Sequence, residues 1–159
     1  MVNYDDLIAD RTQQNVNIIK DLSKKRYIDF TDEEKQFWID NIKKGCYTYN
    51  DLNRVESLVQ DIADRCNSLG LNVSVNTRIW AKDEIPSVSE MERYLSNIKK
   101  IRSLNIKLST TPKPPNDIKL NYYEANNIEQ IIKDMNLLLV TPDDINRYCG
   151  TDIYCGESF

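Results

Sequence analysis

Residues 49–62, Tyr-Asn-Asp-Leu-Asn-Arg-Val-Glu-Ser-Leu-Val-Gln-Asp-Ile, open a long amphipathic pattern in this chain. Apolar side chains recur there at three- and four-residue spacing, which is typical of a helix that packs one face against a core. The pattern continues to Leu69, and Gly70 then offers the left-handed conformation that ends many helices. We predict a helix from Asp51 to Leu69 with this inward stripe: Leu52, Val55, Leu58, Ile62, Cys66 and Leu69.

The same stretch is echoed later in the chain. Residues 49–62 align without a gap on residues 122–135, with Tyr, Asn, Glu and Asp identical at four positions. Any two amphipathic helices share an apolar stripe, but the shared polar positions favour a duplication. The first copy is followed by an alternating segment, residues 73–79, and the same offset from the second copy lands on residues 146–152. We predict that these two segments are structural counterparts that can pair in one small sheet.

Further helix patterns lie on both sides of the first copy. They cover residues 12–25, 31–45 and 87–101, and the second copy extends to residue 139. Thr31 to Glu34 and Ser87 to Glu90 are capping boxes, and Gly45 is interpreted as a helix stop. The predicted fold is therefore mainly α, a bundle of about five helices, with a small β element formed by short strands near residues 72–80 and 147–156.

Proline content suggests how the chain is divided. Residues 108–117 hold three prolines and are interpreted as a stiff, extended connector. Residues 1–107 then form a helical domain with one strand, and residues 118–159 form a helix plus a C-terminal docking strand. We expect these parts to make one structural unit, because 159 residues is the size of a single domain.

Composition excludes several classes of function. The formal net charge is −4, whereas binding to nucleic acid needs a basic face. No apolar run is long enough to cross a bilayer, and the N-terminus lacks the apolar region of a signal peptide. Histidine is absent and the four cysteines are loosely spaced, which argues against a zinc site and against a His-activated nucleophile. We therefore expect no enzyme activity, no catalytic or metal-binding residue, no cofactor, and no binding to nucleic acid or membrane.

The C-terminal stretch repeats Tyr-Cys-Gly within residues 148–156. A single strand would place its small apolar residues on one face, as expected over a core. A hairpin without a disulfide, and a disulfide or metal site, stay open as alternatives. A strand at a chain end can add to the sheet edge of a neighbour. Trp80 is either a core anchor or a second contact, so the candidate partner-binding residues are these: Trp80, Tyr148, Cys149, Ile153, Tyr154 and Cys155.

A set of segments in a fixed order carries a family resemblance. Asp10-Arg-Thr12 is followed by Thr31-Asp-Glu-Glu-Lys35 with Trp38, and then by residues 49–56. The later members are Trp80 with residues 85–95, Thr110-Thr-Pro112, residues 124–129, and an ending of the form Tyr-x-Gly-x-x-Ile-Tyr-x-Gly-Glu. Together they resemble a family of small virion structural proteins of tailed bacteriophages of Clostridia-like hosts.

The resemblance implies a structural role in the phage particle, in the tail, the baseplate, the neck or a fibre attachment. It implies no catalytic residues. The expected partners are other virion proteins and further copies of this chain, and the expected location is the virion after synthesis in the host cytoplasm. The alternative is a phage-encoded cytoplasmic helical module that binds and regulates a host protein.

Overall fold

The computed structural model describes residues 3–104 and 108–139, and within them the chain is mainly helical, as predicted. Its elements are α1 (Gln13–Leu22), a 3-10 turn η1 (Tyr27–Asp29), α2 (Asp32–Gly45), α3 (Tyr49–Ser68), α4 (Val88–Arg102) and α5 (Tyr122–Leu138). The capping boxes predicted at Thr31 and Ser87 are confirmed, since each hydroxyl accepts the backbone N–H three residues later. Gly70, at φ 81°, follows the end of α3 as predicted.

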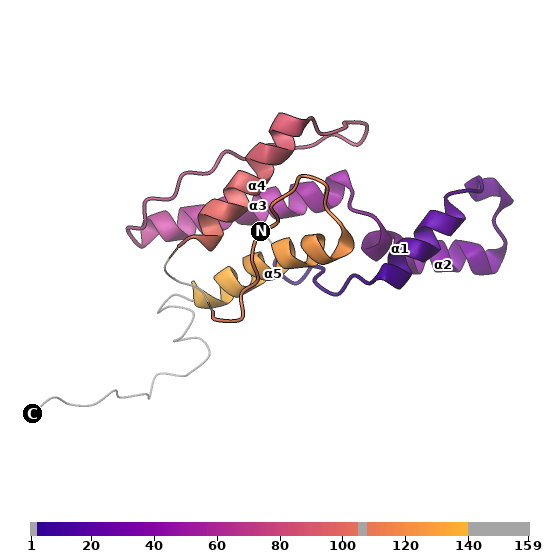
Figure 1. Ribbon diagram of the computed structural model, residues 1–159, viewed down its shortest axis with the longest axis horizontal. Coiled ribbons are helices and arrows are strands. Elements are labelled where there is room, and N and C mark those ends of the chain that lie inside the picture. The colour runs from indigo at the N-terminus through magenta and orange to yellow at the C-terminus, as the bar shows by residue number, and fades with distance from the viewer. Residues whose placement is uncertain (1–2, 105–107, 140–159) are drawn as a thin grey trace, which may run out of the picture.

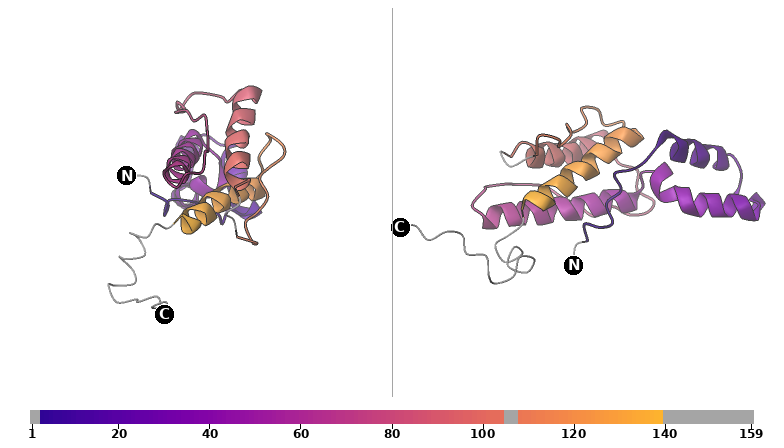
Figure 2. Two further views of the ribbon diagram at one scale, coloured as in Figure 1. Left: turned by 90° about the vertical axis from the view of Figure 1, so that its left-hand side faces the viewer. Right: turned by 90° about the horizontal axis from the view of Figure 1, so that it is seen from below.

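The helices divide into a body and a projecting arm (Figure 1). In the body, α3 packs on α4 and α5, and α4 packs on α5. Their facing sides bury a continuous apolar core that includes Val55, Ile62, Ile98 and Ile132. The arm is the hairpin of α1 and α2, which pack chiefly on each other and extend away from the body. The chain before α1 runs along the body before it enters the arm (Figure 2).

The small β element is not present in the described residues. Residues 71–80 run back along α3 without pairing to any strand, so the strand predicted at residues 72–80 is wrong within residues 3–104 and 108–139. The second predicted strand, residues 147–156, lies outside the described residues. Alternation would put Val73 and Ile79 on the same face of a strand, but Val73 is buried while Ile79 is 87% exposed.

Asparagine side chains take the place of the missing strand partner. Asn67 bonds both the N–H and the C=O of Val73, at 2.7 and 2.9 Å. Asn97 does the same for Asn76, at 3.1 and 2.8 Å. An amide side chain carries one acceptor and one donor group, as a neighbouring strand does, so it satisfies both polar groups of one residue. The extended segment is therefore attached to α3 and α4 through side chains.

Gly45 allows the two helices of the arm to approach closely. It is the last residue of α2, where the sequence predicted the helix to end, but it does not adopt the left-handed conformation of many helix ends. A Cβ added at Gly45 would lie 2.6 Å from the backbone oxygen of Asn15 and would also collide with the Ile19 side chain. The absence of a side chain is what lets α1 pack against the last turn of α2.

Replacement of Asn97 by alanine tests the amide attachment. Asn97 is 2% exposed, and its loss leaves the N–H of Asn76 without its partner, while the C=O of Asn76 keeps only the Arg93 guanidinium. We expect Asn97→Ala to lower the free energy of unfolding by about 1–3 kcal/mol, measured by urea denaturation. Asn72→Ala is the matched control, because Asn72 is exposed and should change stability by less than about 0.5 kcal/mol. Equal effects of the two substitutions would contradict the proposed attachment.

Gly45→Ala tests the close contact in the arm. Alanine favours helices over glycine by about 1 kcal/mol, but here the added methyl group meets backbone that cannot rotate away. We expect the overpacking to outweigh the gain in helix propensity, so that the arm loses about 1–2 kcal/mol of stability. Hydrogen exchange should show faster exchange of the α1 and α2 amides while the body amides keep their protection. Slower exchange in the arm of the variant would show that the helices have room for the methyl group.

Candidate functional site

A buried ionic cluster joins the chain before α1 to the helices of the body. The Arg11 guanidinium contacts Asp51 at 3.0 Å and Glu129 at 2.7 Å. Arg54 contacts the same two carboxylates, at 2.6 and 2.9 Å. Glu129 is fully buried and also accepts the backbone N–H of Ile8 at 2.6 Å. Two positive and two negative groups thus neutralise one another, as buried charges must.

The cluster makes further structural contacts with the chain around it. The second oxygen of Asp51 accepts the backbone N–H of Thr48 at 2.7 Å, just before α3 begins. The Arg11 guanidinium also lies over the Tyr47 ring, 5.2 Å from its centroid. Burial, followed by the nearby Glu129 charge, raises the pKa of Tyr47, so its hydroxyl stays protonated at neutral pH. These groups therefore hold the chain together and leave little capacity for acid–base chemistry.

A second carboxylate–arginine pair lies where α3 meets α4. Glu56 is 2% exposed and contacts Arg93 at 2.5 Å. It also accepts the indole N–H of Trp80 at 3.3 Å. The guanidinium carbons of Arg78 and Arg93 lie 4.5 and 5.7 Å from the centroid of the Trp80 ring, so cation–π contacts add to the hydrogen bonds. The indole is fixed from several directions.

The two clusters use the positions that the sequence echo shares. Asn53 and Glu56 on α3 correspond to Asn126 and Glu129 on α5. Asn53 bonds the N–H and C=O of Trp80 at 2.7 and 2.9 Å. Asn126 bonds those of Arg11 at 3.0 and 2.9 Å. In both copies the asparagine holds an extended segment and the glutamate, three residues on, binds an arginine.

The segments held by the two copies come from different parts of the chain. The first copy holds residues that follow its helix, whereas the second copy holds residues 8–11, which precede α1. The predicted counterpart of residues 73–79, residues 146–152, lies outside the described residues. The shared Asn and Glu positions were visible in the sequence, but the segments that they bind could not be predicted from it.

The candidate partner-binding residues fall into two groups. Trp80 is 2% exposed and belongs to the core, so its ring is not on the surface of this chain. Tyr148, Cys149, Ile153, Tyr154 and Cys155 lie outside the described residues. Beside Trp80, the structure exposes apolar side chains that the sequence had not singled out: Ile79 is 87% exposed, Ile85 89% and Val88 60%. We call residues 79–88 the apolar loop.

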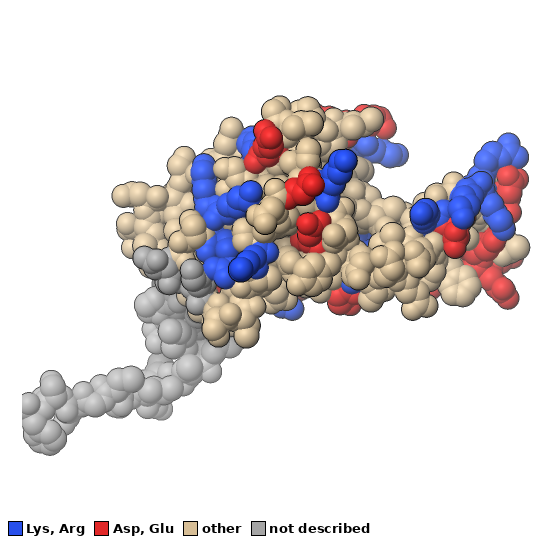
Figure 3. All heavy atoms as spheres, in the orientation of Figure 1, with Lys and Arg blue, Asp and Glu red and all other residues tan. Residues whose placement is uncertain are grey.

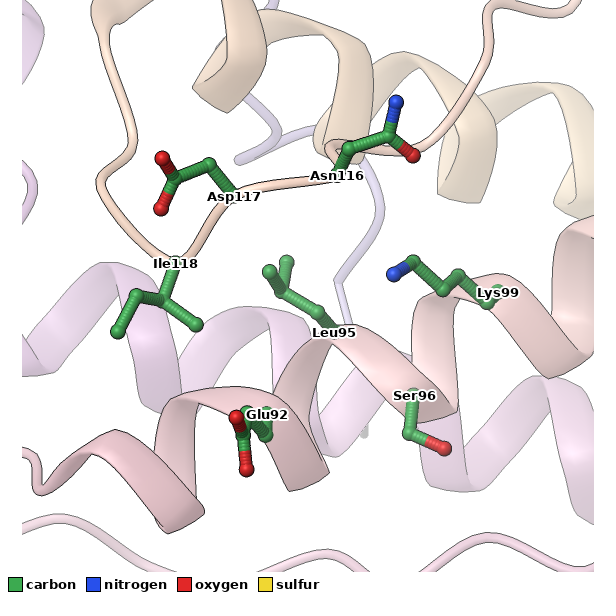
Figure 4. A pocket seen from close by; sticks show the side chains of 7 residues that line it. All are labelled: Glu92, Leu95, Ser96, Lys99, Asn116, Asp117 and Ile118. Atoms are coloured by element: carbon green, nitrogen blue, oxygen red, sulfur yellow. The ribbon is translucent and has the colours of Figure 1, made fainter.

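A shallow hollow lies between α4 and the chain that leads to α5 (Figure 4). Glu92, Ser96 and Lys99 line it from α4, while Asn116 and Asp117 line it from the opposite side. Leu95 and Ile118 supply its apolar surface. Its charged side chains are all exposed, so water screens them and no unusual reactivity is expected. The hollow is better suited to surface contact than to catalysis.

Metal-binding side chains and thiols are the remaining groups of chemical interest in the described residues. Residues 3–104 and 108–139 contain no group of three or more acidic or cysteine side chains placed to hold a metal ion. Cys46 and Cys66 are free thiols, and burial raises the pKa of both, which disfavours the reactive thiolate. Over the same residues, no helix is both long and apolar enough to cross a membrane.

The chain matches no protein-family model, no curated protein and no solved structure.

Arg11→Met tests whether the ionic cluster stabilises the body. The substitution keeps an apolar stem but leaves Asp51 and Glu129 to share one arginine. We expect the free energy of unfolding to fall by about 3–5 kcal/mol in urea denaturation. The double variant Arg11→Met/Glu129→Gln should lose less free energy of unfolding than the two single variants lose in sum, because the two removed charges form an ion pair. Arg26→Met is the control, because the Arg26 side chain is 81% exposed. If the losses of stability at Arg11 and Glu129 simply add in the double variant, the two residues are not coupled.

Proposed function

We propose that this chain is a non-enzymatic structural or adaptor protein of a bacteriophage particle. The observation that supports the proposal most directly is the ordered set of segments from Asp10 to the Tyr-x-Gly-Glu ending, which resembles small virion proteins of tailed phages. Its proposed partners are other virion proteins, and its proposed location is the virion. An assembly role requires stable surfaces for contact and no reaction centre.

The engagement of the ionisable groups supports an assembly role. The buried carboxylates Asp51, Glu56 and Glu129 all bind arginines that hold one part of the chain to another. A catalytic group must instead reach a substrate and exchange a proton with it. The projecting arm and the apolar loop are the kinds of feature that let one protein reach another across an assembly.

Two segments are proposed to make the contacts with virion partners. The first is the apolar loop, where Ile79 and Ile85 are almost fully exposed next to the anchored Trp80 ring. The rigid indole fixes the loop, so a partner that binds the isoleucines loses less conformational freedom. The second is the C-terminal segment, residues 148–156, which is proposed to dock as a strand on a neighbouring sheet edge.

Particle analysis tests the assembly role. We expect quantitative mass spectrometry of purified phage particles to find this chain at a fixed copy number. Recovery of the chain only in the host cytoplasm, bound to a host protein, would instead support the regulatory module.

Variants of the apolar loop test the proposed contact. Complementation with Ile79→Asp/Ile85→Asp should reduce incorporation into particles at least tenfold, because each buried isoleucine contributes about 1.5–3 kcal/mol to an interface. Leu137→Asp is the matched control, since Leu137 is 62% exposed on α5. Deletion of residues 148–159 separately tests the docking strand. Normal incorporation of the loop variant or of the deletion would remove the corresponding segment from the proposal.

A further inference from the structure

The outer face of α2 carries a mixed stripe along the arm. Its members recur at helical spacing on one face: Glu33, Gln36, Phe37, Asp40 and Lys43. Phe37 is 54% exposed, and the first four residues line a shallow surface hollow. We call this set the α2 stripe. A large aromatic side chain in the middle of an otherwise charged helix face is a candidate contact.

The charges at the two ends of the α2 stripe lack partners within the described chain. Other charged side chains of α2 are taken: Asp32 pairs with Lys35, Glu34 with Lys25 and Lys44 with Asp10. Glu33 and Lys43 form no ion pair with any residue in the ranges 3–104 and 108–139. Acidic and basic side chains gather on the arm (Figure 3). The stripe thus begins with a free negative charge and ends with a free positive charge.

This order of charges is self-complementary. Glu33 and Lys43 are ten residues apart, which is about 15 Å along a helix. If two α2 helices lie antiparallel around a two-fold axis near residue 38, Glu33 of each copy faces Lys43 of the other. The same axis brings Phe37 close to its equivalent and Gln36 opposite Asp40. An isologous interface requires that one surface fit itself in this way.

The arm has a small core, which favours packing of further helices against it. Between residues 13 and 45, the buried apolar side chains of the arm are Ile19, Leu22 and Phe30. A hairpin this short is weakly stabilised by its own core, and helix pairs commonly gain stability by packing into bundles. We infer that the α2 stripe binds the same stripe of a second copy of this chain, antiparallel and around a two-fold axis. This inference does not depend on the proposed role in a phage particle.

Charge exchange on the full chain tests the inference. Sedimentation equilibrium over a range of concentrations should show a monomer–dimer equilibrium. Glu33→Lys and Lys43→Glu should each weaken dimerisation at least tenfold, since each single change sets like charges against each other at both ends. The double variant Glu33→Lys/Lys43→Glu should dimerise like the original chain. An equimolar mixture of the two single variants should form a heterodimer, because both ends of one stripe are then basic and both ends of the other are acidic.

Two further variants make the test specific. Phe37→Ala should weaken the dimer about tenfold, because an exposed aromatic ring loses its burial against the second copy. Glu92→Lys/Lys99→Glu on α4 is the matched control and should leave dimerisation unchanged, with circular dichroism confirming the fold of every variant. A chain that stays monomeric at all concentrations would overturn the inference. So would a dimer that is equally stable in the single and double variants of α2.

Discussion

The fold depends on how α3 and α5 satisfy the backbone of chain segments that have no strand partner. A buried N–H or C=O without a hydrogen bond costs about 1–3 kcal/mol, so an extended segment can cross a helical body only if something replaces a sheet. Asn53 and Asn126 supply that replacement by binding both polar groups of Trp80 and Arg11. The described part of the chain is therefore a helical body to which extended segments are attached, and Asn53, Asn67, Asn97 and Asn126 make four of the attachments.

The glutamate of each copy adds selectivity to the asparagine contact. A carboxylate that is buried beside the bound segment requires a cation as its partner. Glu56 pairs with Arg93, whereas Glu129 pairs with Arg11. A hydrophobic pair of the same size could be equally stable, but it would accept other segments and other registers. The Asn-x-x-Glu pattern is thus used in both copies to hold an extended segment beside an arginine. Because these charges are neutralised internally, the surfaces proposed for contact with partners are, among the described residues, the arm and the apolar loop.

The sequence predicted the parts of the fold that depend on neighbouring residues. Helix starts at Thr31 and Ser87 follow from local capping chemistry, and Gly70 follows from a local backbone conformation. Residues 72–80 show the limit of such reasoning. The alternation of apolar and polar residues indicates an extended chain, but it does not show whether the backbone pairs with a strand or with amide side chains. Gly45 shows the same limit, because a glycine that ends a helix and one that admits a neighbouring helix look alike in sequence.

The placement of the candidate site was harder to predict for the same reason. Trp80 could be read as a core anchor or as a contact, and only its distance from Glu56 and its stacked arginines decide for the core. The exposure of Ile79 follows from the attachment of Trp80, since the backbone held by Asn53 turns the preceding side chain outward. Long-range partners therefore settle which apolar residues face outward.

The contacts of residues 8–11 also bear on the order in which the molecule forms during synthesis. Ile8 and Arg11 bind residues that lie 121 and 115 positions further along the chain. Such high contact order delays closure, because the ribosome must release α5 before these bonds can form. Until then the nascent chain carries α3 and α4 without the contacts that Glu129 makes to Ile8 and Arg11. Residues 8–11 are made well before α5, yet they reach their final place only after it.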